Sequence, residues 1–244
     1  MADLPKPLCG IVPPMVTPLK DTDTLDNEGL EKLIDHLITG GVSGIFALGT
    51  TGEGPSLSYK LRKEVIEKTC KLVDGRVPVL VGITDSSFRE AVNVACQAKD
   101  TGAAAVVLAH PFYFGVSEAE IDQYIANIAP QIPLPIFLYN MPGCTKLTFS
   151  PEQLRKAADI DNVVGFKDSS ANMNYFHKCL AAVEDIPDFS MLVGPEELLA
   201  ETVLLGGHGG VNGGANMFPK LYVDLYNAAK EENLEKTREL HRKV

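Results

Sequence analysis

The sequence predicts an α/β protein, a (β/α)8 TIM barrel that residues 1–244 form as a single domain. Short apolar runs of strand length alternate along the chain with stretches of helical periodicity. Eight such strand–helix units in 244 residues match the barrel in count and length. The alternative is an open, doubly wound sheet, but no G-x-G-x-x-G follows the first apolar run, which disfavours a dinucleotide-binding version of it.

The expected strands are short apolar runs. They are Ile11–Val16, Gly44–Leu48, Val77–Ile83, Ala104–Leu108, Pro135–Tyr139, Val163–Lys167, Met191–Val193 and Gly209–Val211. Among the expected helices, the first shows apolar residues at amphipathic spacing, namely Leu30, Leu33, Ile34, Leu37 and Ile38. Pro151 is expected at a first helical position after Ser150. The other expected helices are Phe88–Ala98, Glu118–Ile128, Asn172–Val183, Glu197–Leu205 and Leu221–Leu240.

Composition excludes several classes of protein. A net charge of −10 argues against nucleic acid as a partner, because binding phosphates needs a basic face. No apolar run approaches the length that spans a membrane, and no apolar leader is visible at the N-terminus. Five scattered cysteines indicate reduced thiols and a cytoplasmic protein; they are Cys9, Cys70, Cys96, Cys144 and Cys179. The five histidines are also dispersed, so we expect no metal site.

Lys167 is the first candidate catalytic residue. It ends the apolar run Val163–Lys167, so a barrel places its amine at the carboxyl end of a strand, where such barrels have their active sites. An amine in apolar surroundings has a pKa below the ~10.4 of a free lysine. We therefore predict a Schiff-base nucleophile. The alternative is a lysine that ends a strand and pairs with a carboxylate.

Two tyrosines follow neighbouring strands. Tyr139 ends the fifth strand, next to that of Lys167, where it can transfer protons or simply pack with its hydroxyl bonded to the backbone. Tyr113 follows the fourth strand and can extend this relay, whereas Phe112 and Phe114 are expected to pack.

Two glycine-rich segments also follow strands. In Gly49–Gly54 the glycines and the hydroxyls of Thr50 and Thr51 suit a carboxylate, or else form a plain turn. The segment Gly206–Gly214 suits a phosphate or close backbone packing. His208 within it is expected to be structural.

Five motifs in order cover nearly the whole chain. They are G-T-T-G-E at 49–53, P-F-Y-F at 111–114, Y-N-M-P at 139–142, G-F-K-D-S at 165–169 and the glycine-rich loop at 206–214. On these motifs the chain resembles the dihydrodipicolinate synthase / N-acetylneuraminate lyase family of pyruvate-dependent class I aldolases.

The resemblance implies roles for individual residues. Lys167 would form the Schiff base with pyruvate or another 2-oxo acid, and Tyr139 would transfer protons. Gly49, Thr50 and Thr51 would bind the carboxylate of the 2-oxo acid. Val211 would make a backbone contact near the pyruvate. Tyr113 would be a relay residue that reaches across a dimer interface, which implies a homo-oligomer, a dimer or tetramer.

The chain departs from the pattern of the dihydrodipicolinate synthases in one motif. There an arginine that holds the carboxylate of the aldehyde substrate follows Y-N-x-P, and Cys144 stands in its place here. A thiol cannot form that bidentate pair. Glu196 and Glu197 resemble acidic residues that sugar-acid lyases place against substrate hydroxyls; alternatively, they open a helix, where acidic residues are favoured.

The function expected from these residues is a Schiff-base lyase without a cofactor. It would cleave or form a C–C bond between pyruvate and an aldehyde, on a 2-keto-3-deoxy sugar acid or sialic acid. A dihydrodipicolinate synthase, with Lys146 replacing the arginine, remains an alternative, as does a sugar-acid dehydratase. A non-catalytic 2-oxo acid sensor is disfavoured by the intact pair of Lys167 and Tyr139.

The family usually carries further helices after the barrel. The sequence ends at Val244, inside or just after the eighth expected helix. We expect this difference to affect oligomer assembly more than chemistry.

Overall fold

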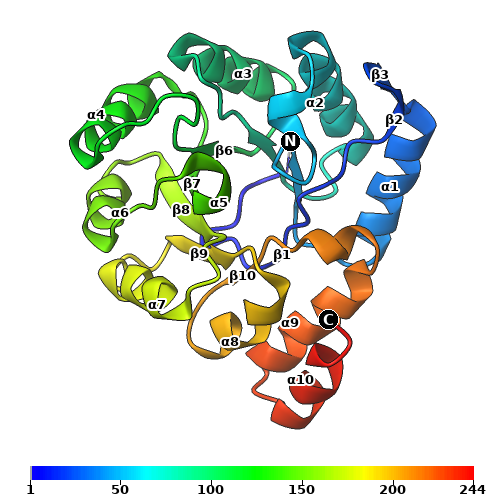
Figure 1. The fold of residues 1–244 in the computed structure, drawn as a ribbon. Helices are drawn as coiled ribbons and strands as arrows, with labels where there is room; N and C mark the ends of the chain where they lie inside the picture. Colours follow the sequence, from blue (N-terminus) through cyan, green and yellow to red (C-terminus); the bar gives the residue numbers. More distant parts are fainter. Residues whose placement is uncertain (1) are drawn as a thin grey trace.

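The computed structural model describes residues 2–244 and has the predicted barrel architecture. Eight parallel strands form one sheet in the order β1-β10-β9-β8-β7-β6-β5-β4. Figure 1 shows them at the centre of the molecule with the helices around them. The barrel strands are β1 (Gly10–Ile11), β4 (Ile45–Ala47), β5 (Val79–Gly82), β6 (Ala105–Ala109), β7 (Ile136–Asn140), β8 (Val163–Asp168), β9 (Ser190–Val193) and β10 (Gly209–Gly210).

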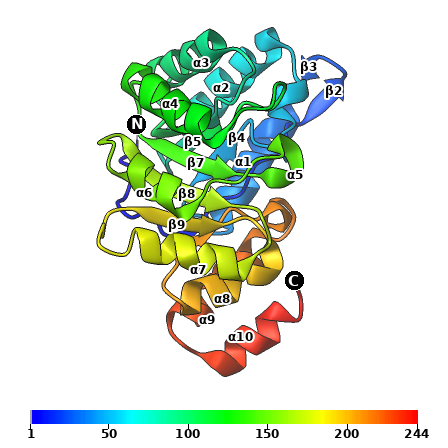
Figure 2. The same ribbon diagram turned by 60° about the vertical axis from the view of Figure 1, so that its left-hand side comes forward.

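Eight helices alternate with these strands around the barrel. They are α1 (Asn27–Thr39), α2 (Tyr59–Val73), α3 (Phe88–Asp100), α4 (Glu118–Ile128), α6 (Pro151–Ala158), α7 (Met173–Ala182), α8 (Leu199–Leu204) and α9 (Pro219–Lys230). The additional elements are the hairpin β2 (Leu19–Asp21) and β3 (Thr24–Leu25), and the helices α5 (Pro142–Thr145) and α10 (Leu234–His241). Helical turns of the 3-10 type are formed by Gly54–Ser56, Ala129–Gln131, Glu196–Leu198 and Gly213–Asn216. Figure 2 shows α10 outside the ring, next to α8 and α9.

Helix starts follow the sequence signals, and one expected helix is corrected. α6 begins at Pro151 behind a capping box in which Ser150 bonds the Gln153 amide. The expected helix Leu221–Leu240 is two helices instead. Glu232 has φ 56, in the left-handed region that ends a helix. Asn233 then caps α10 through the Lys236 amide.

Two prolines shorten the strand that closes the barrel. The first expected strand, Ile11–Val16, is reduced to β1 and one isolated parallel bridge between Pro14 and Phe46. Because proline has no N–H to donate, few backbone hydrogen bonds join this segment to β4. The Phe46 amide bonds the Pro13 carbonyl at 3.0 Å, and the Met15 amide bonds the Phe46 carbonyl at 2.8 Å. These bonds complete the ring between β1 and β4.

Apolar side chains fill the space inside the barrel as well as the layer between sheet and helices. The interior cluster includes Val12, Phe46, Phe137 and Leu192. Leu8 joins it from the N-terminal segment, where its amide bonds the buried Ser190 hydroxyl at 2.9 Å. In Figure 2 the N-terminus lies at the opposite end of the barrel from α5. The N-terminal segment therefore closes that end, and the open end is the one at the strand carboxyl ends.

A bulge in β8 sets the direction of Lys167. Ile136 pairs with Val163 but Phe137 pairs with Gly165, so β8 has one extra residue at this point. A Cβ on Gly165 would lie 2.5 Å from the Phe137 ring, so only glycine fits on this inner face. Beyond the bulge Phe166 faces the helix layer. Strand alternation then turns Lys167 inward.

None of the helices within residues 2–244 combines the length and the apolar character that crossing a membrane requires.

Candidate active site

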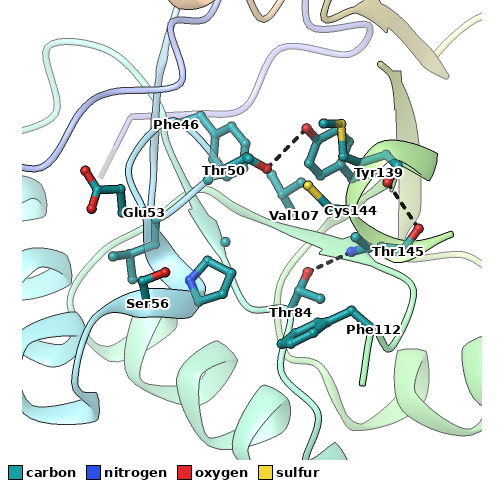
Figure 3. Close-up of a pocket in the computed structure, with 16 residues that line it drawn as sticks. Phe46, Thr50, Glu53, Ser56, Thr84, Val107, Phe112, Tyr139, Cys144 and Thr145 are labelled. Carbon is teal, nitrogen blue, oxygen red and sulfur yellow. Dashed lines mark hydrogen bonds between the residues drawn. The ribbon is translucent and has the colours of Figure 1, made fainter. Parts of the chain in front are cut away.

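A cavity of ≈ 310 Å³ opens at the carboxyl ends of β4 to β7. Figure 3 shows the 16 residues that line it, which include Tyr139 from β7 and Thr50 from the segment after β4. A volume of this size suits a small ligand and lies near the lower end of the range for ligand pockets. Its position is the one at which barrels of this type carry their chemistry.

Lys167 is buried beside this cavity. Its side chain is 5% exposed, and its strand position pairs with Tyr139 on one side and Leu192 on the other. Its Nζ lies 4.1 Å from the centroid of the Tyr139 ring and 5.4 Å from that of Phe46, and both rings line the cavity. Lys167 is not itself among the residues that line the cavity, but its amine lies against two aromatic rings that are.

Burial lowers the pKa of the Lys167 amine, and the neighbouring Tyr139 hydroxyl opposes part of that shift. No ion pair found in residues 2–244 involves Lys167. The alternative of a lysine paired with a carboxylate is thus disfavoured. Both features favour a deprotonated amine, which is the nucleophilic form.

Thr50 and Tyr139 form the hydroxyl pair of the site. The Thr50 Oγ1 lies 3.4 Å from the Tyr139 Oη. A dashed line marks this contact in Figure 3. Gly49 also lines the cavity. The loop is compact because Gly54 packs against the Leu48 carbonyl, where a Cβ would lie 2.2 Å from the oxygen. The loop brings Gly49 and Thr50 to the cavity, as a carboxylate-binding role requires.

The other two residues expected at the carboxylate lie outside the cavity lining. Thr51 points toward the glycine-rich segment, where its Oγ1 is 3.9 Å from the position of a Cβ on Gly213. Val211 is buried in the barrel interior, and its amide bonds the Val193 carbonyl at 2.8 Å. A backbone contact from Val211 to a ligand would therefore use its carbonyl oxygen.

Glu196 is hydrogen-bonded within the protein through both carboxylate oxygens, and its expected role at substrate hydroxyls stays a prediction. Its Oε1 accepts from the Gly214 amide, and its Oε2 accepts from the Tyr222 hydroxyl. Burial, followed by these carboxylate contacts, raises the pKa of Tyr222. Glu197 is exposed, and neither glutamate lines the cavity. Glu196 therefore holds the glycine-rich segment to Tyr222 on α9.

Cys144 on α5 lines the cavity, whereas Lys146 does not. The Lys146 Nζ donates to the Gly143 carbonyl at 2.6 Å and thereby folds back on its own helix. Among the described residues that line the cavity, none is lysine, arginine or histidine, and Glu53 is the one with a charge. Figure 3 shows the Glu53 carboxylate turned away from Tyr139 and Cys144. The substrate end of the cavity is thus uncharged.

The aromatic residues after β6 divide between cavity and surface. Phe112 lines the cavity. Tyr113 and Phe114 are each 75% exposed and meet edge to face with ring centroids 5.0 Å apart. Phe114 was expected to pack, and within this chain it does not, because no element covers the loop. Tyr113 is likewise not brought to Tyr139 and Lys167 within one chain.

A buried polar pair that the sequence reading assigned no role lies directly behind the Tyr139–Lys167 pair. Asn140 and Asp168 are strand partners one position further on, and the Asn140 Nδ2 bonds the Asp168 Oδ1 at 2.8 Å. The Asp168 Oδ2 accepts from the Ser170 hydroxyl at 2.8 Å. Burial raises the pKa of Asp168, while these hydrogen bonds oppose that rise. The pair holds the ends of β7 and β8 together, and its sequence signal was its place inside two motifs.

The buried His110 and the half-buried His208 both pack within the fold, outside the cavity lining. His110 is fully buried and stacks on Phe149 with ring centroids 3.8 Å apart. Burial lowers the pKa of His110 from 6.5 to about 4, so its ring is neutral near pH 7. The His208 Nδ1 accepts from the Met191 amide at 2.9 Å, as expected for a structural residue. Across the part of the chain that the structure describes, no three His, Cys, Asp or Glu side chains gather as metal ligands would.

Comparison with known proteins gives a consistent result. The sequence pattern of the Dihydrodipicolinate synthetase family matches residues 7–244. A probable 2-dehydro-3-deoxy-D-pentonate aldolase of Escherichia coli, YjhH, is 36% identical over 98% of this chain and 80% of its own length. The 4-hydroxy-tetrahydrodipicolinate synthase of Methanocaldococcus jannaschii is also 36% identical, over 96% of this chain and 80% of its own length.

Solved structures show the same relationship. The structure of dihydrodipicolinate synthase from Bacteroides thetaiotaomicron superposes with a TM-score of 0.95 and is 59% identical, covering 98% of this chain and 80% of its own. Escherichia coli YagE, solved in complex with pyruvate, superposes with a TM-score of 0.93 at 33% identity, covering 96% of this chain and 79% of its own.

Proposed function

Because the chain belongs to the dihydrodipicolinate synthetase family, we propose that it is a class I lyase that cleaves a hydroxylated 2-oxo acid into pyruvate and an aldehyde. The buried Lys167 amine beside the Tyr139 ring is the nucleophile. Gly49 and Thr50 hold the carboxylate of the 2-oxo acid at the cavity wall. Thr51 and Val211 support this end of the site from outside the cavity lining.

The chemistry follows from these positions. The neutral Lys167 amine attacks the C2 carbonyl, Tyr139 transfers protons to the departing oxygen, and water leaves to form the iminium. The iminium accepts the electron pair of the C3–C4 bond as that bond breaks. The substrate C4 hydroxyl loses its proton and becomes the aldehyde. The remaining enamine is protonated at C3, and water hydrolyses the resulting iminium to release pyruvate and the free Lys167 amine.

The preference for a sugar acid over aspartate semialdehyde rests on one observation: none of the described residues that line the cavity is a cation. Leaving the carboxylate of an aldehyde substrate without a charged partner costs roughly 1–3 kcal/mol or more. A hydroxylated tail needs no such partner and can bond the hydroxyls of Ser56 and Thr84, which line the same cavity. The names of YjhH and YagE, both 2-dehydro-3-deoxy sugar-acid aldolases by name, support this choice for the present chain.

Dihydrodipicolinate synthase is the second candidate. It is favoured by the 59% identity to the dihydrodipicolinate synthase from Bacteroides thetaiotaomicron. In this case pyruvate bound on Lys167 would condense with aspartate semialdehyde. At the position where the synthases have an arginine for the carboxylate of that aldehyde, this cavity has Cys144. Lys146 does not replace the arginine in this structure, because its amine is bonded to the Gly143 carbonyl.

The experiment is a comparison of initial rates with the wild-type protein. Cleavage of several 2-keto-3-deoxy sugar acids and sialic acid is measured through pyruvate release, next to condensation of pyruvate with aspartate semialdehyde. We expect at least one sugar acid to have a kcat/KM roughly 10²-fold or more above that for the semialdehyde, since an unpaired carboxylate costs a few kcal/mol. Efficient condensation with no cleavage of any sugar acid would establish the second candidate instead.

We further propose that the chain acts as a cytoplasmic homo-oligomer, a dimer or tetramer, folded as one domain. The exposed rings of Tyr113 and Phe114 support this, because large aromatic side chains rarely stay in solvent together. A partner would bury them and bring Tyr113 toward a neighbouring cavity. Sedimentation of the wild type and of Tyr113→Ala, which should weaken the assembly, tests this proposal.

A further inference from the structure

Arg62 binds three separate groups on one side of the cavity. From α2, its Nη1 donates to the Asp85 Oδ2 at 2.9 Å, its Nη2 to the Pro55 carbonyl at 2.9 Å and its Nε to the Leu57 carbonyl at 3.1 Å. The Arg62 and Asp85 side chains are only 13% and 9% exposed. This ion pair is therefore largely removed from solvent and weakly screened.

These bonds join two segments that form cavity wall. Pro55 and Ser56 line the cavity from the segment after β4, and Thr84 lines it from the segment after β5. Asp85, next to Thr84, also accepts from the Tyr59 hydroxyl at 3.0 Å. We call the Arg62–Asp85 pair and its bonds to Pro55 and Leu57 the wall brace. Neither charged residue lines the cavity, so the wall brace acts on a ligand through Pro55, Ser56 and Thr84.

The wall brace is placed to affect one half of the reaction. The wall it holds contains the Ser56 and Thr84 hydroxyls, whereas Lys167 and Tyr139 are held by the paired strands β7 and β8. A buried ion pair is weak evidence for stability, because apolar residues of similar volume often serve as well. Its geometric effect is specific: only a guanidinium offers a planar set of donors to two carbonyls and a carboxylate at once.

We propose that Arg62 and Asp85 are positioning residues that set how tightly the aldehyde half of the substrate binds. This inference rests on the proposed lyase function for the identity of that half. Gly49 and Thr50 belong to the same segment as Pro55, but Lys167 and Tyr139, which form the adduct with pyruvate, lie on β7 and β8, outside the wall brace. Loosening the wall therefore weakens recognition of the aldehyde without preventing formation of the pyruvate adduct on Lys167.

The test compares Arg62→Lys with the wild type in the condensation direction. Pyruvate is combined with glycolaldehyde, glyceraldehyde and erythrose, and the rate of pyruvate trapping by borohydride is measured separately. We expect KM for the aldehydes to rise at least about tenfold and the preference among the three to flatten, since small misplacements cost up to roughly 10²-fold. The rate of pyruvate trapping at saturating pyruvate, which depends on Lys167 and Tyr139, should stay within about twofold of wild type.

Arg76 provides a matched control because it has the same pattern of bonds on the outer surface. Its Nη1 bonds the Asp35 Oδ1 at 2.7 Å, and its Nε and Nη2 bond the carbonyls of Val73 and Leu72. Arg76→Lys should leave the aldehyde preference unchanged. Asp85→Asn, which keeps the size of the side chain but removes its charge, should shift the aldehyde KM in the same direction as Arg62→Lys.

Two results would overturn the proposal. One is an Arg62→Lys protein whose aldehyde KM and preference equal those of the wild type. The other is a parallel loss of pyruvate trapping and aldehyde binding, which indicates a general structural role. If the wild type uses aspartate semialdehyde and no hydroxyaldehyde, the lyase function fails; the wall brace is then tested with the semialdehyde, whose KM should rise in Arg62→Lys.

Discussion

The two halves of the cavity are built in different ways. On the pyruvate side, Gly49 and Thr50 follow β4, but the reacting pair Lys167 and Tyr139 are partners in adjacent parallel strands, and the register of those strands determines their distance. On the aldehyde side, Ser56, Phe112 and Cys144 come from separate connecting segments. Strand register is fixed by many backbone bonds, whereas a connecting segment depends on a few side-chain contacts. The pyruvate half can therefore stay constant while the aldehyde half changes its substrate.

The largest effect on kcat is expected from Tyr139→Phe, which alters only the pyruvate side of the cavity. Removal of the hydroxyl should lower kcat by roughly 10²–10⁴-fold, the usual contribution of a positioned acid or base. The ring remains beside Lys167, so the fold should be retained. Steady-state kinetics and thermal unfolding of the variant check this; turnover near the wild-type rate would show that Tyr139 only packs.

A smaller effect is expected from Cys144→Arg, and it should be confined to the aldehyde side of the cavity. A guanidinium on α5 gives the cavity a cation that can pair with a carboxylate on the aldehyde. We expect kcat/KM for aspartate semialdehyde to rise by roughly 10–100-fold, since hydrogen bonds to charged groups contribute about 1.5–3 kcal/mol. Pyruvate trapping should not change, and Cys144→Ser serves as the control without a charge.

Glu196→Ala tests whether the glycine-rich segment is held as the structure indicates. The substitution leaves the Gly214 amide and the Tyr222 hydroxyl without their acceptor. We expect the free energy of unfolding to fall by about 1–3 kcal/mol. Glu197→Ala, at the exposed neighbour, should stay within about 0.5 kcal/mol of wild type. A Glu196→Ala protein with wild-type stability that loses only sugar-acid cleavage would show that Glu196 contacts the substrate.

An effect that is absent at neutral pH concerns His110, which lies at the end of β6 with neither ring nitrogen bonded to a described residue. Its pKa in the folded protein is about 4, below the 6.5 of the free group, so protonation favours the unfolded chain. The contribution of the neutral His110 ring to the free energy of unfolding is fully present above pH 6.5 and is lost as the pH falls toward 4. At pH 5 this amounts to about 2 kcal/mol.

Urea unfolding at pH 7.5 and pH 5 measures this dependence. In His110→Leu the group that titrates is gone, so the variant should lose about 2 kcal/mol less than the wild type between the two pH values. Equal losses in the two proteins would mean that the buried ring does not take part in acid unfolding.

The sequence predicts residues at strand ends better than residues in the connecting segments. Lys167 and Tyr139 were predictable because each ends an apolar run, and parallel strands bring such ends together. The bulge in β8 could not be predicted, because one extra valine in Val163–Val164 does not interrupt the apolar run. The barrel was predicted from its alternation, while the break at Glu232 was missed because helical periodicity resumes beyond it.

Residues of the connecting segments were predicted less well for a physical reason. Glu196 has the type and place expected of a substrate contact, but its two oxygens are used by Gly214 and Tyr222, which are distant in sequence. The wall brace depends on Arg62, which reads as one more charged residue on the face of a helix. Long-range side-chain contacts of this kind have no periodicity or motif by which a sequence reveals them.

The central claim is that Lys167 forms the covalent bond to the 2-oxo acid. The most direct measurement is incubation with pyruvate and borohydride, followed by mass spectrometry of the intact protein and of its peptides. We expect one reduced pyruvyl group per chain, located on Lys167, and none in Lys167→Arg, because a guanidinium stays protonated and cannot attack a ketone. A label on any other lysine, or no label in a preparation that turns over substrate, would contradict it.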